Sequence, residues 1–277
     1  MTNRSLSTFI ILFAGLSTSA FAEETRYVTK ENIHYYSDAA NRSDAYIDER
    51  CVLDIYHPTN KKGFATVVWF HGGGLKGGNK KIADQLKRQG IAVVAVNYRL
   101  YPRAKAPSYL EDSAAAVAWT FKNIKSLGGD PKKIFVSGSS AGGYLTAMIG
   151  LDKRWLKVHD INADLIAGLI PLAGQMLTHF TVKEERGIGK TKMVIDHLAP
   201  ISYLRSTAPP VLLVTGDREK EMLGRYEENA FMYRMLKVVG HPDVRLIELS
   251  GFGHAPRKPF YPLLLKEVAR VLKPMKD

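Results

Sequence analysis

Residues 133–144 read Lys-Ile-Phe-Val-Ser-Gly-Ser-Ser-Ala-Gly-Gly-Tyr, and this stretch decides the fold. Ile134–Val136 is a short apolar run of β-branched and aromatic residues, which is typical of a buried strand. Gly-Ser-Ser-Ala-Gly follows at 138–142, and residues 143–149 then have the character of a helix. A Gly-x-Ser-x-Gly turn between a strand and a helix holds its central serine in a strained conformation and presents the hydroxyl above the sheet edge. Ser140 is therefore the predicted nucleophile, although Gly and Ser are also ordinary turn residues, so the other parts of such a site must be found elsewhere.

Strand and helix signals alternate along the rest of the chain, as an α/β fold requires. The expected strands are residues 33–36, 51–56, 65–70, 91–96, 134–136, 165–170, 211–215 and 244–249. The expected helices are residues 82–88, 107–126, 143–149 and 225–239, with a closing helix that ends at 272. Near-continuous apolar runs such as Ala65–Phe70 and Ile91–Val96 predict strands buried on both faces of a mostly parallel sheet flanked by helices. We expect residues 23–277 to form one such domain, since the length suits a single large core.

One segment breaks the alternation. Residues 175–200 are polar, carry Gly187 and Gly189, and lie just past a predicted strand end. Insertions at the carboxyl ends of parallel strands cover active sites in folds of this class. We therefore expect a small lid here.

The N-terminus has the features of an export signal. Arg4 supplies a positive charge, residues 6–16 are apolar, and Ala20–Ala22 is an A-x-A cleavage signal. We expect residues 1–22 to be a signal peptide that is removed, which predicts a secreted or periplasmic protein. The apolar run is too short to span a bilayer comfortably, so no stable membrane insertion is expected.

Cysteine content and charge exclude several function classes. Cys51 is the single cysteine, which rules out an intrachain disulfide and suits neither a zinc site nor a redox motif. We expect it to pack as a small apolar residue. The net charge of +12 permits binding to nucleic acid. However, the lysines and arginines are scattered and no nucleic-acid motif accompanies them, so a solvated basic surface is the expectation.

His71–Gly74 reads His-Gly-Gly-Gly and directly follows the predicted strand that ends at Phe70. The serine mechanism needs backbone N–H groups aimed at the developing oxyanion, and glycines let the backbone approach the substrate closely. We predict Gly73, Gly74 and Ala141 as the donors. Taken alone, the four residues fit a flexible turn equally well. A phosphate loop is not supported, because the GxxxxGK[ST] spacing is missing.

The base and the acid should follow the last two parallel strands. Eight histidines compete, and His254 is the one that comes right after the last predicted strand, within Ser250–Pro256. This places it at the same sheet edge as Ser140, and we predict it as the base. The acid should follow the strand 211–215, where Asp217 and Glu219 are both candidates. Aspartate is the commoner acid in this role. The alternative is that one of the two only caps the following turn.

These motifs together resemble the α/β-hydrolase superfamily, and specifically the hormone-sensitive-lipase-like and acetyl-xylan- or feruloyl-esterase-like carboxylesterases. The likeness covers nearly all of the chain after residue 22. It is carried by residues 71–74, 97–102, 106–107, 111–112, 128–131, 138–143 and 253–254. In such esterases the acid often lies three residues after the strand-end glycine, which implies Glu219, with Asp217 at a supporting position. The resemblance also implies that Arg99 and Asp112 brace the loops below the site.

The resemblance implies a serine carboxylesterase that uses no metal or organic cofactor and acts on small-molecule or carbohydrate-linked esters, and the export signal adds that it is exported. Because the expected lid at 175–200 is short and polar, we expect short acyl esters to be turned over in preference to long-chain ones. Ser140 attacks the ester carbonyl in this hypothesis, and His254 takes its proton. Two other classes remain open. An exported serine peptidase shares the triad but usually adds a propeller domain, and an inactive hydrolase-fold binding protein typically lacks one triad residue.

Overall fold

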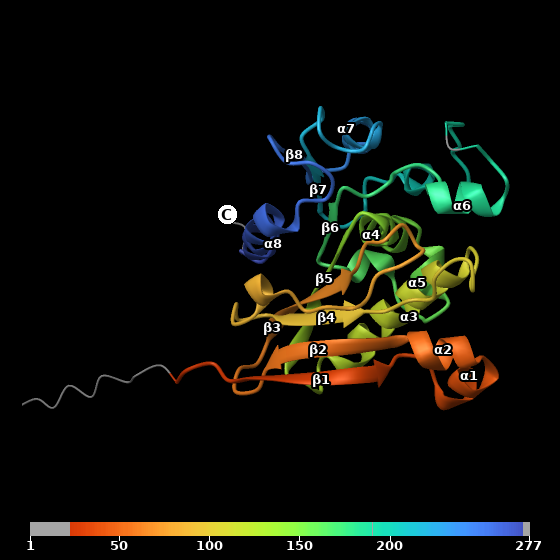
Figure 1. Cartoon of the computed structure of the whole chain (residues 1–277). Helices are drawn as coiled ribbons and strands as arrows, with labels where there is room; N and C mark the ends of the chain where they lie inside the picture. Colours follow the sequence, from red (N-terminus) through yellow and green to blue (C-terminus); the bar gives the residue numbers. More distant parts are fainter. Residues whose placement is uncertain (1–22, 190, 274–277) are drawn as a thin grey trace, which may run out of the picture.

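The computed structural model describes residues 23–189 and 191–273, and within them one eight-stranded sheet carries the fold (Figure 1). The predicted signal peptide lies outside the described residues. The strands are β1 (Tyr27–His34), β2 (Val52–Pro58), β3 (Phe64–Phe70), β4 (Ala92–Val96), β5 (Gly129–Ser139), β6 (Gly168–Leu172), β7 (Val211–Gly216) and β8 (Val244–Leu249). Their order across the sheet is β1-β2-β4-β3-β5-β6-β7-β8. The β1–β2 and β2–β4 pairs are antiparallel and all the others are parallel, which confirms the predicted mostly parallel α/β sheet.

Helices cover both faces of this sheet (Figure 1). They are α1 (Asp38–Ser43), α2 (Ala45–Arg50), α3 (Ser108–Asn123), α4 (Ala141–Leu151), α5 (Arg154–Lys157), α6 (Phe180–Glu185), α7 (Arg225–Val238) and α8 (Arg257–Val271). Short 3₁₀ turns occur at Asp84–Leu86, Ala163–Leu165 and Pro200–Tyr203. None of the helices in the described part of the chain is both long enough and apolar enough to cross a membrane.

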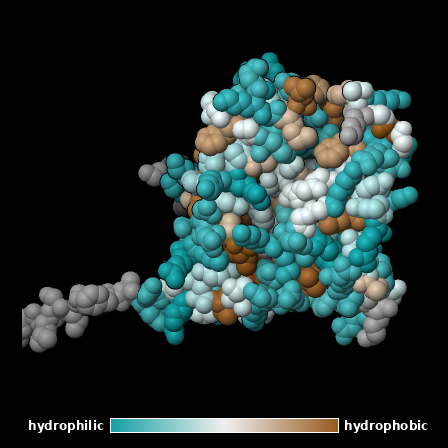
Figure 2. Space-filling view, viewed as in Figure 1, coloured by the Kyte–Doolittle hydropathy of each residue, from teal (hydrophilic) through white to brown (hydrophobic). Residues whose placement is uncertain are grey.

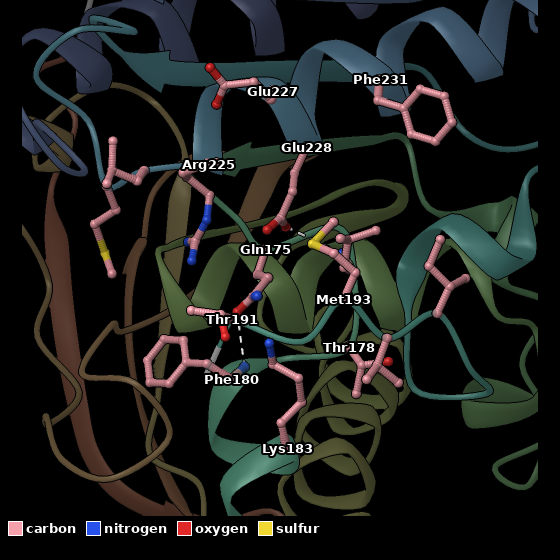
Figure 3. A pocket seen from close by; sticks show the side chains of 16 residues that line it. Gln175, Thr178, Phe180, Lys183, Thr191, Met193, Arg225, Glu227, Glu228 and Phe231 are labelled. Carbon is pink, nitrogen blue, oxygen red and sulfur yellow. Dashed lines mark hydrogen bonds between the residues drawn. The ribbon is translucent and has the colours of Figure 1, made fainter. Parts of the chain in front are cut away.

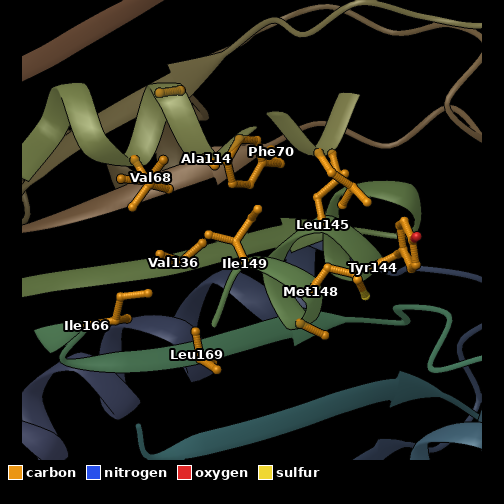
Figure 4. Packing of buried hydrophobic residues seen from close by; sticks show 14 of the residues in the cluster. Val68, Phe70, Ala114, Val136, Tyr144, Leu145, Met148, Ile149, Ile166 and Leu169 are labelled. Atoms are coloured by element: carbon orange, nitrogen blue, oxygen red, sulfur yellow. The ribbon is translucent and has the colours of Figure 1, made fainter. Parts of the chain in front are cut away.

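The core has two layers, one on each face of the sheet, and β3 contributes to both. Val68 and Phe70 pack into the larger layer, together with α3 and α4 (Figure 4). Met232 and Leu236 of α7 belong to the same layer. Val67 and Trp69 point the other way and pack against α8. Successive side chains of a strand alternate between faces, so a strand covered on both sides must be apolar at every position. This explains the near-continuous apolar run in the sequence.

Four local expectations differ from the structure. The strand expected at 33–36 is β1, Tyr27–His34, because the polar residues before Ile33 also pair with β2 at the edge of the sheet. The helix expected at 82–88 is only the 3₁₀ turn Asp84–Leu86, because Ile82 and Leu86 alone do not supply a helical face to bury. Residues 37–50, for which no helix was expected, form α1 and α2, each capped at its N-terminus by a side chain. The strand expected from 165 starts at Gly168.

Candidate active site

Ser140 occupies the turn between β5 and α4 with φ 56° and ψ −113°. A positive φ is strained for a residue with a side chain, as the Gly-x-Ser-x-Gly pattern predicts. The flanking residues Gly138 and Gly142 must be glycines, because there is no room for a Cβ at either position. A Cβ on Gly142 would lie 2.1 Å from the Phe70 carbonyl oxygen, and one on Gly138 would lie 2.5 Å from the Gly142 carbonyl carbon. The Ser140 N–H also donates to the Leu172 carbonyl at 2.7 Å, which fixes the turn to β6.

His254 lies in the loop between β8 and α8 and brings its imidazole to Ser140. Its Nε2 is 2.8 Å from the Ser140 Oγ. Its other ring nitrogen, Nδ1, contacts the Glu221 carboxylate. A carboxylate only accepts, so Nδ1 carries the proton and Nε2 is left to accept from the serine hydroxyl. The ring is thereby oriented as a general base toward Ser140.

The Glu221 carboxylate is fully buried and held on both oxygens. The Gly216 N–H donates to Oε2 at 3.0 Å and the Met222 N–H donates to Oε1 at 2.9 Å. Burial by itself raises the pKa of this carboxyl. The hydrogen bonds from His254 and from the two backbone N–H groups outweigh burial and hold the pKa below its usual value. Glu221 is therefore ionised at neutral pH beside the imidazole.

The predicted acids, Asp217 and Glu219, are not at this position. Asp217 Oδ1 accepts from the Glu219 N–H at 3.0 Å, and Oδ2 accepts from the Gly251 N–H at 2.6 Å. These backbone hydrogen bonds, the Gly251 bond first, lower the pKa of Asp217. Asp217 thus caps the turn and ties it to the loop after β8, and Glu219 lies on the exposed surface.

Glu221 was missed because a turn follows the strand end. The Glu221 N–H donates to the Asp217 carbonyl at 2.7 Å, so residue 221 folds back toward the end of β7. The sequence did offer a signal for Glu221, which lies four residues after the turn-capping Asp217. Residues at this spacing share one face of a helical turn, so Glu221 could be expected to return toward the strand end.

The Gly-rich loop lies against Ser140, as expected. A Cβ on Gly72 would be 2.9 Å from the Ser139 carbonyl oxygen and 3.4 Å from the Ser140 Cβ. Gly73 and Gly74 adopt φ values of 115° and 64°, which favour glycine. The structure therefore brings these two residues beside Ser140 and beside Ala141 at the start of α4. Together with His254 they line an open cleft of about 530 Å³.

A buried arginine that the sequence analysis did not single out braces this loop. Arg50, at the end of α2, donates from Nη2 to His71 Nε2 at 3.2 Å, and from Nε to the Tyr98 carbonyl at 3.1 Å. Since Arg50 can only donate, His71 carries its proton on Nδ1 and donates it to the Gly72 carbonyl at 2.7 Å. The His71 ring also stacks on Tyr98. Burial first, and then the charge of Arg50, lower the pKa of His71 to about 4.

Helix α6 holds the same loop from the other side. The Thr181 hydroxyl donates to the Gly74 carbonyl, and a Cβ on Gly74 would lie 3.1 Å from the Phe180 ring. An ion pair of 2.6 Å joins Lys76 to Glu184. The segment between β6 and β7 (residues 173–210, the β6–β7 segment) is therefore packed against the Gly-rich loop.

Arg99 and Asp112 form an ion pair below the site, as the resemblance implied. Arg99 Nη2 is 2.8 Å from Asp112 Oδ1, and the Arg99 N–H donates to Oδ2 at 2.8 Å. The Tyr36 hydroxyl also donates to this carboxylate, at 2.9 Å. Asp112 is completely buried, so these bonds satisfy a charge that would otherwise be costly.

Comparisons with known proteins find esterases among those similar to this chain. The family model described as BD-FAE matches residues 53–167. Esterase LipC of Mycobacterium tuberculosis is 27% identical over 256 residues, which cover 83% of this chain and 60% of LipC. Carboxylesterase NlhH of the same organism is 40% identical over 98 residues, covering 33% of this chain and 30% of NlhH. The chain thus spans less than two thirds of these relatives.

Solved structures show the same fold. A truncated form of a carbohydrate esterase from gut microbiota superposes with a TM-score of 0.71 at 19% identity, covering 90% of this chain and 98% of that one. A bacterial heroin esterase superposes with a TM-score of 0.66 at 19% identity, covering 92% and 87% of the two chains. The chain therefore has the α/β-hydrolase fold of these esterases, and the relatives that it matches in sequence are named as esterases.

Proposed function

We propose that this protein is a serine carboxylesterase that hydrolyses short-chain carboxylic esters. The observation that carries the proposal is the chain of contacts from Ser140 through His254 to the buried Glu221 carboxylate. The family relationship supports it, because the relatives LipC and NlhH are named as an esterase and a carboxylesterase.

The reaction follows from the geometry. Ser140 Oγ attacks the ester carbonyl while its proton passes to His254 Nε2, and Glu221 stabilises the imidazolium that forms. The N–H groups of Gly73, Gly74 and Ala141 bind the oxyanion of the tetrahedral intermediate. The intermediate collapses to an acyl-serine as the alcohol oxygen takes the proton from His254. Water, deprotonated by the same nitrogen, then releases the carboxylic acid and restores the serine.

The proposed preference for short acyl groups is inferred from the modest volume of the cleft, about 530 Å³, and from the short β6–β7 segment beside it. The alcohol is either a small molecule or a carbohydrate in this proposal. A panel of acetyl, butyryl and dodecanoyl esters, with an acetylated sugar included, tests both parts. A higher kcat/KM for the dodecanoyl ester than for the acetyl ester would contradict the short-chain proposal.

A fluorophosphonate probe tests the mechanism directly. We expect labelling of the wild-type protein, peptide mapping to Ser140 and loss of ester hydrolysis on labelling. A folded protein that neither reacts with the probe nor hydrolyses any ester of the panel would be an inactive hydrolase-fold binding protein. Cleavage of peptides with no ester hydrolysis would instead favour the peptidase.

We also propose that the protein is exported, on the strength of Arg4, the apolar residues 6–16 and the A-x-A signal at Ala20–Ala22. Mass spectrometry of the protein purified from its native source should find Glu23 as the first residue. A chain that still begins at Met1 would contradict export by a cleaved signal peptide.

A further inference from the structure

A second cavity, of about 770 Å³, adjoins the cleft around Ser140, and we call it the side pocket (Figure 3). Its walls come from the β6–β7 segment on one side and from α7 with the loop before it on the other. Two side chains, Phe180 and Met222, line both the side pocket and the cleft. The two spaces are therefore adjoining parts of one region, and Phe180 and Met222 stand at the passage between them.

The side pocket has an apolar rim that is open to solvent. Its exposed large apolar side chains are Met193, Ile195, Met222, Leu223 and Phe231. Met193 is 71% exposed and Leu223 is fully exposed. Figure 2 shows apolar side chains gathered along the upper edge of the molecule, where α7 lies in Figure 1. Exposed apolar side chains around a concavity mark a binding site for an apolar group.

The charged side chains deeper in the side pocket are already bonded to its walls. Lys183 Nζ donates to a backbone carbonyl of the β6–β7 segment at 2.9 Å, and Arg225 Nη1 donates to the carbonyl that follows β6 at 2.7 Å. Glu228 Oε2 accepts two backbone N–H groups at 2.8 and 3.3 Å. Glu227 lies on the exposed side of α7. These groups shape the walls, and the binding surface that they leave is mainly apolar.

The reaction decides which end of the ester enters the side pocket. The leaving alcohol takes its proton from His254 Nε2, so it departs on the His254 side of Ser140. Met222, at the passage, lines the cleft together with His254 and directly follows Glu221, whose carboxylate contacts the imidazole. The passage therefore opens on the His254 side. The acyl group stays on Ser140 within the cleft.

We propose that the side pocket binds the alkyl or aryl group of the alcohol, so that the protein prefers short-chain esters of apolar alcohols to those of sugars. This inference rests on the proposed esterase function and names the alcohol that the function left open.

Two series of esters, used below their solubility limits, test the assignment. The alcohol series is ethyl, butyl and hexyl acetate, and the acyl series is ethyl acetate, butanoate and hexanoate. Full burial of one methylene is worth about a fourfold gain in binding, so we expect kcat/KM to rise at least about tenfold from ethyl to hexyl acetate. In the acyl series, kcat/KM should stay level or fall from ethyl acetate to ethyl hexanoate. A rise in the acyl series with a level alcohol series would overturn the assignment.

A matched pair of variants links the effect to the side pocket. Phe231→Asp places a charge on the rim, and Val238→Asp places the same charge on an exposed position of α7 outside the lining. Phe231→Asp should reduce the hexyl-to-ethyl ratio of kcat/KM at least about fivefold, because the charge must lose water beside an apolar group. Val238→Asp should keep the wild-type ratio.

The two proposals fail in different ways. An equal hexyl-to-ethyl ratio of kcat/KM in the wild type and in both variants would overturn the side pocket as the alcohol site and leave the esterase function intact. No hydrolysis of any acetate, together with no fluorophosphonate labelling of Ser140, would overturn the esterase function and the inference with it.

Discussion

The Glu221 carboxylate contacts Nδ1 of His254 from a position five residues beyond the end of β7 at Gly216. This carboxylate is the only one of the three acids considered, Asp217, Glu219 and Glu221, that is buried at the imidazole. The three acids lie within one short loop, but only Glu221 contacts the imidazole, whereas Asp217 caps the turn and Glu219 is exposed.

Replacement of Glu221 by Gln should lower kcat by about 10³-fold or more, because the amide no longer stabilises the imidazolium and permits the wrong tautomer of His254. Asp217→Asn and Glu219→Gln are the matched controls and should each cost less than about tenfold. Steady-state kinetics on a short acyl ester measure all three. A larger loss in either control than in Glu221→Gln would remove Glu221 from the mechanism.

Replacement of Ser140 by Ala should leave a folded protein whose hydrolysis falls by about 10³-fold or more, because nucleophile and base act as a unit. Circular dichroism checks the fold and a fluorophosphonate probe checks the lost hydroxyl. A variant that keeps a tenth of the wild-type rate would show that Ser140 is not the nucleophile.

Arg50→Met should lower kcat about 10- to 100-fold with a smaller change in KM. The substitution removes the donor that holds His71 and the Tyr98 carbonyl, and so it should loosen the Gly-rich loop that carries the proposed oxyanion donors. Arg234→Met, on the exposed side of α7, is the control and should be neutral. An unchanged kcat in a folded Arg50→Met protein would show that this bracing is dispensable for catalysis.

His71 should make stability depend on pH. Its pKa of about 4 in the folded protein lies below the value of about 6.5 for an unfolded chain. The unfolded chain therefore binds a proton between these values that the folded protein does not. The stabilisation from the neutral ring is complete above about pH 6.5 and is lost as the pH falls toward 4, by about 3 kcal/mol.

Urea unfolding at pH 7 and pH 4.5 measures this loss. His71→Gln, which keeps an acceptor for Arg50, should lose less stability between the two pH values than the wild type. His197→Gln changes an exposed histidine and should behave as the wild type does. An equal loss in free energy of unfolding between pH 7 and pH 4.5 in His71→Gln and in the wild type would contradict this account.

Local patterns in the sequence predicted the parts of the site that depend on short segments. Ser140 and the Gly-rich loop are each specified by a few consecutive residues next to an apolar strand, and backbone sterics restrict what those residues can be. His254 could be predicted because a residue that directly follows a parallel strand lies at a known edge of the sheet.

The parts that depend on tertiary packing could not be predicted in this way. Glu221 reaches His254 through a turn whose direction is set by Asp217 and the loop after β8. Arg50 reaches His71 from α2, in a stretch that has no apolar periodicity and is helical because two side chains cap it. No short pattern carries these contacts, since each joins residues from separate segments.

The contact between α6 and the Gly-rich loop gives the two walls of the side pocket different freedom to evolve. On one wall, Thr181 and Glu184 are bonded to the Gly-rich loop, which carries the proposed oxyanion donors, so a mutation that reshapes this wall should also change kcat. On the other wall, the rim side chains of α7 and of the loop before it face solvent. A mutant library confined to Leu223 and Phe231 should therefore yield variants with new alcohol preferences and an unchanged kcat. A library across α6 should yield new preferences mostly in variants with a lower kcat.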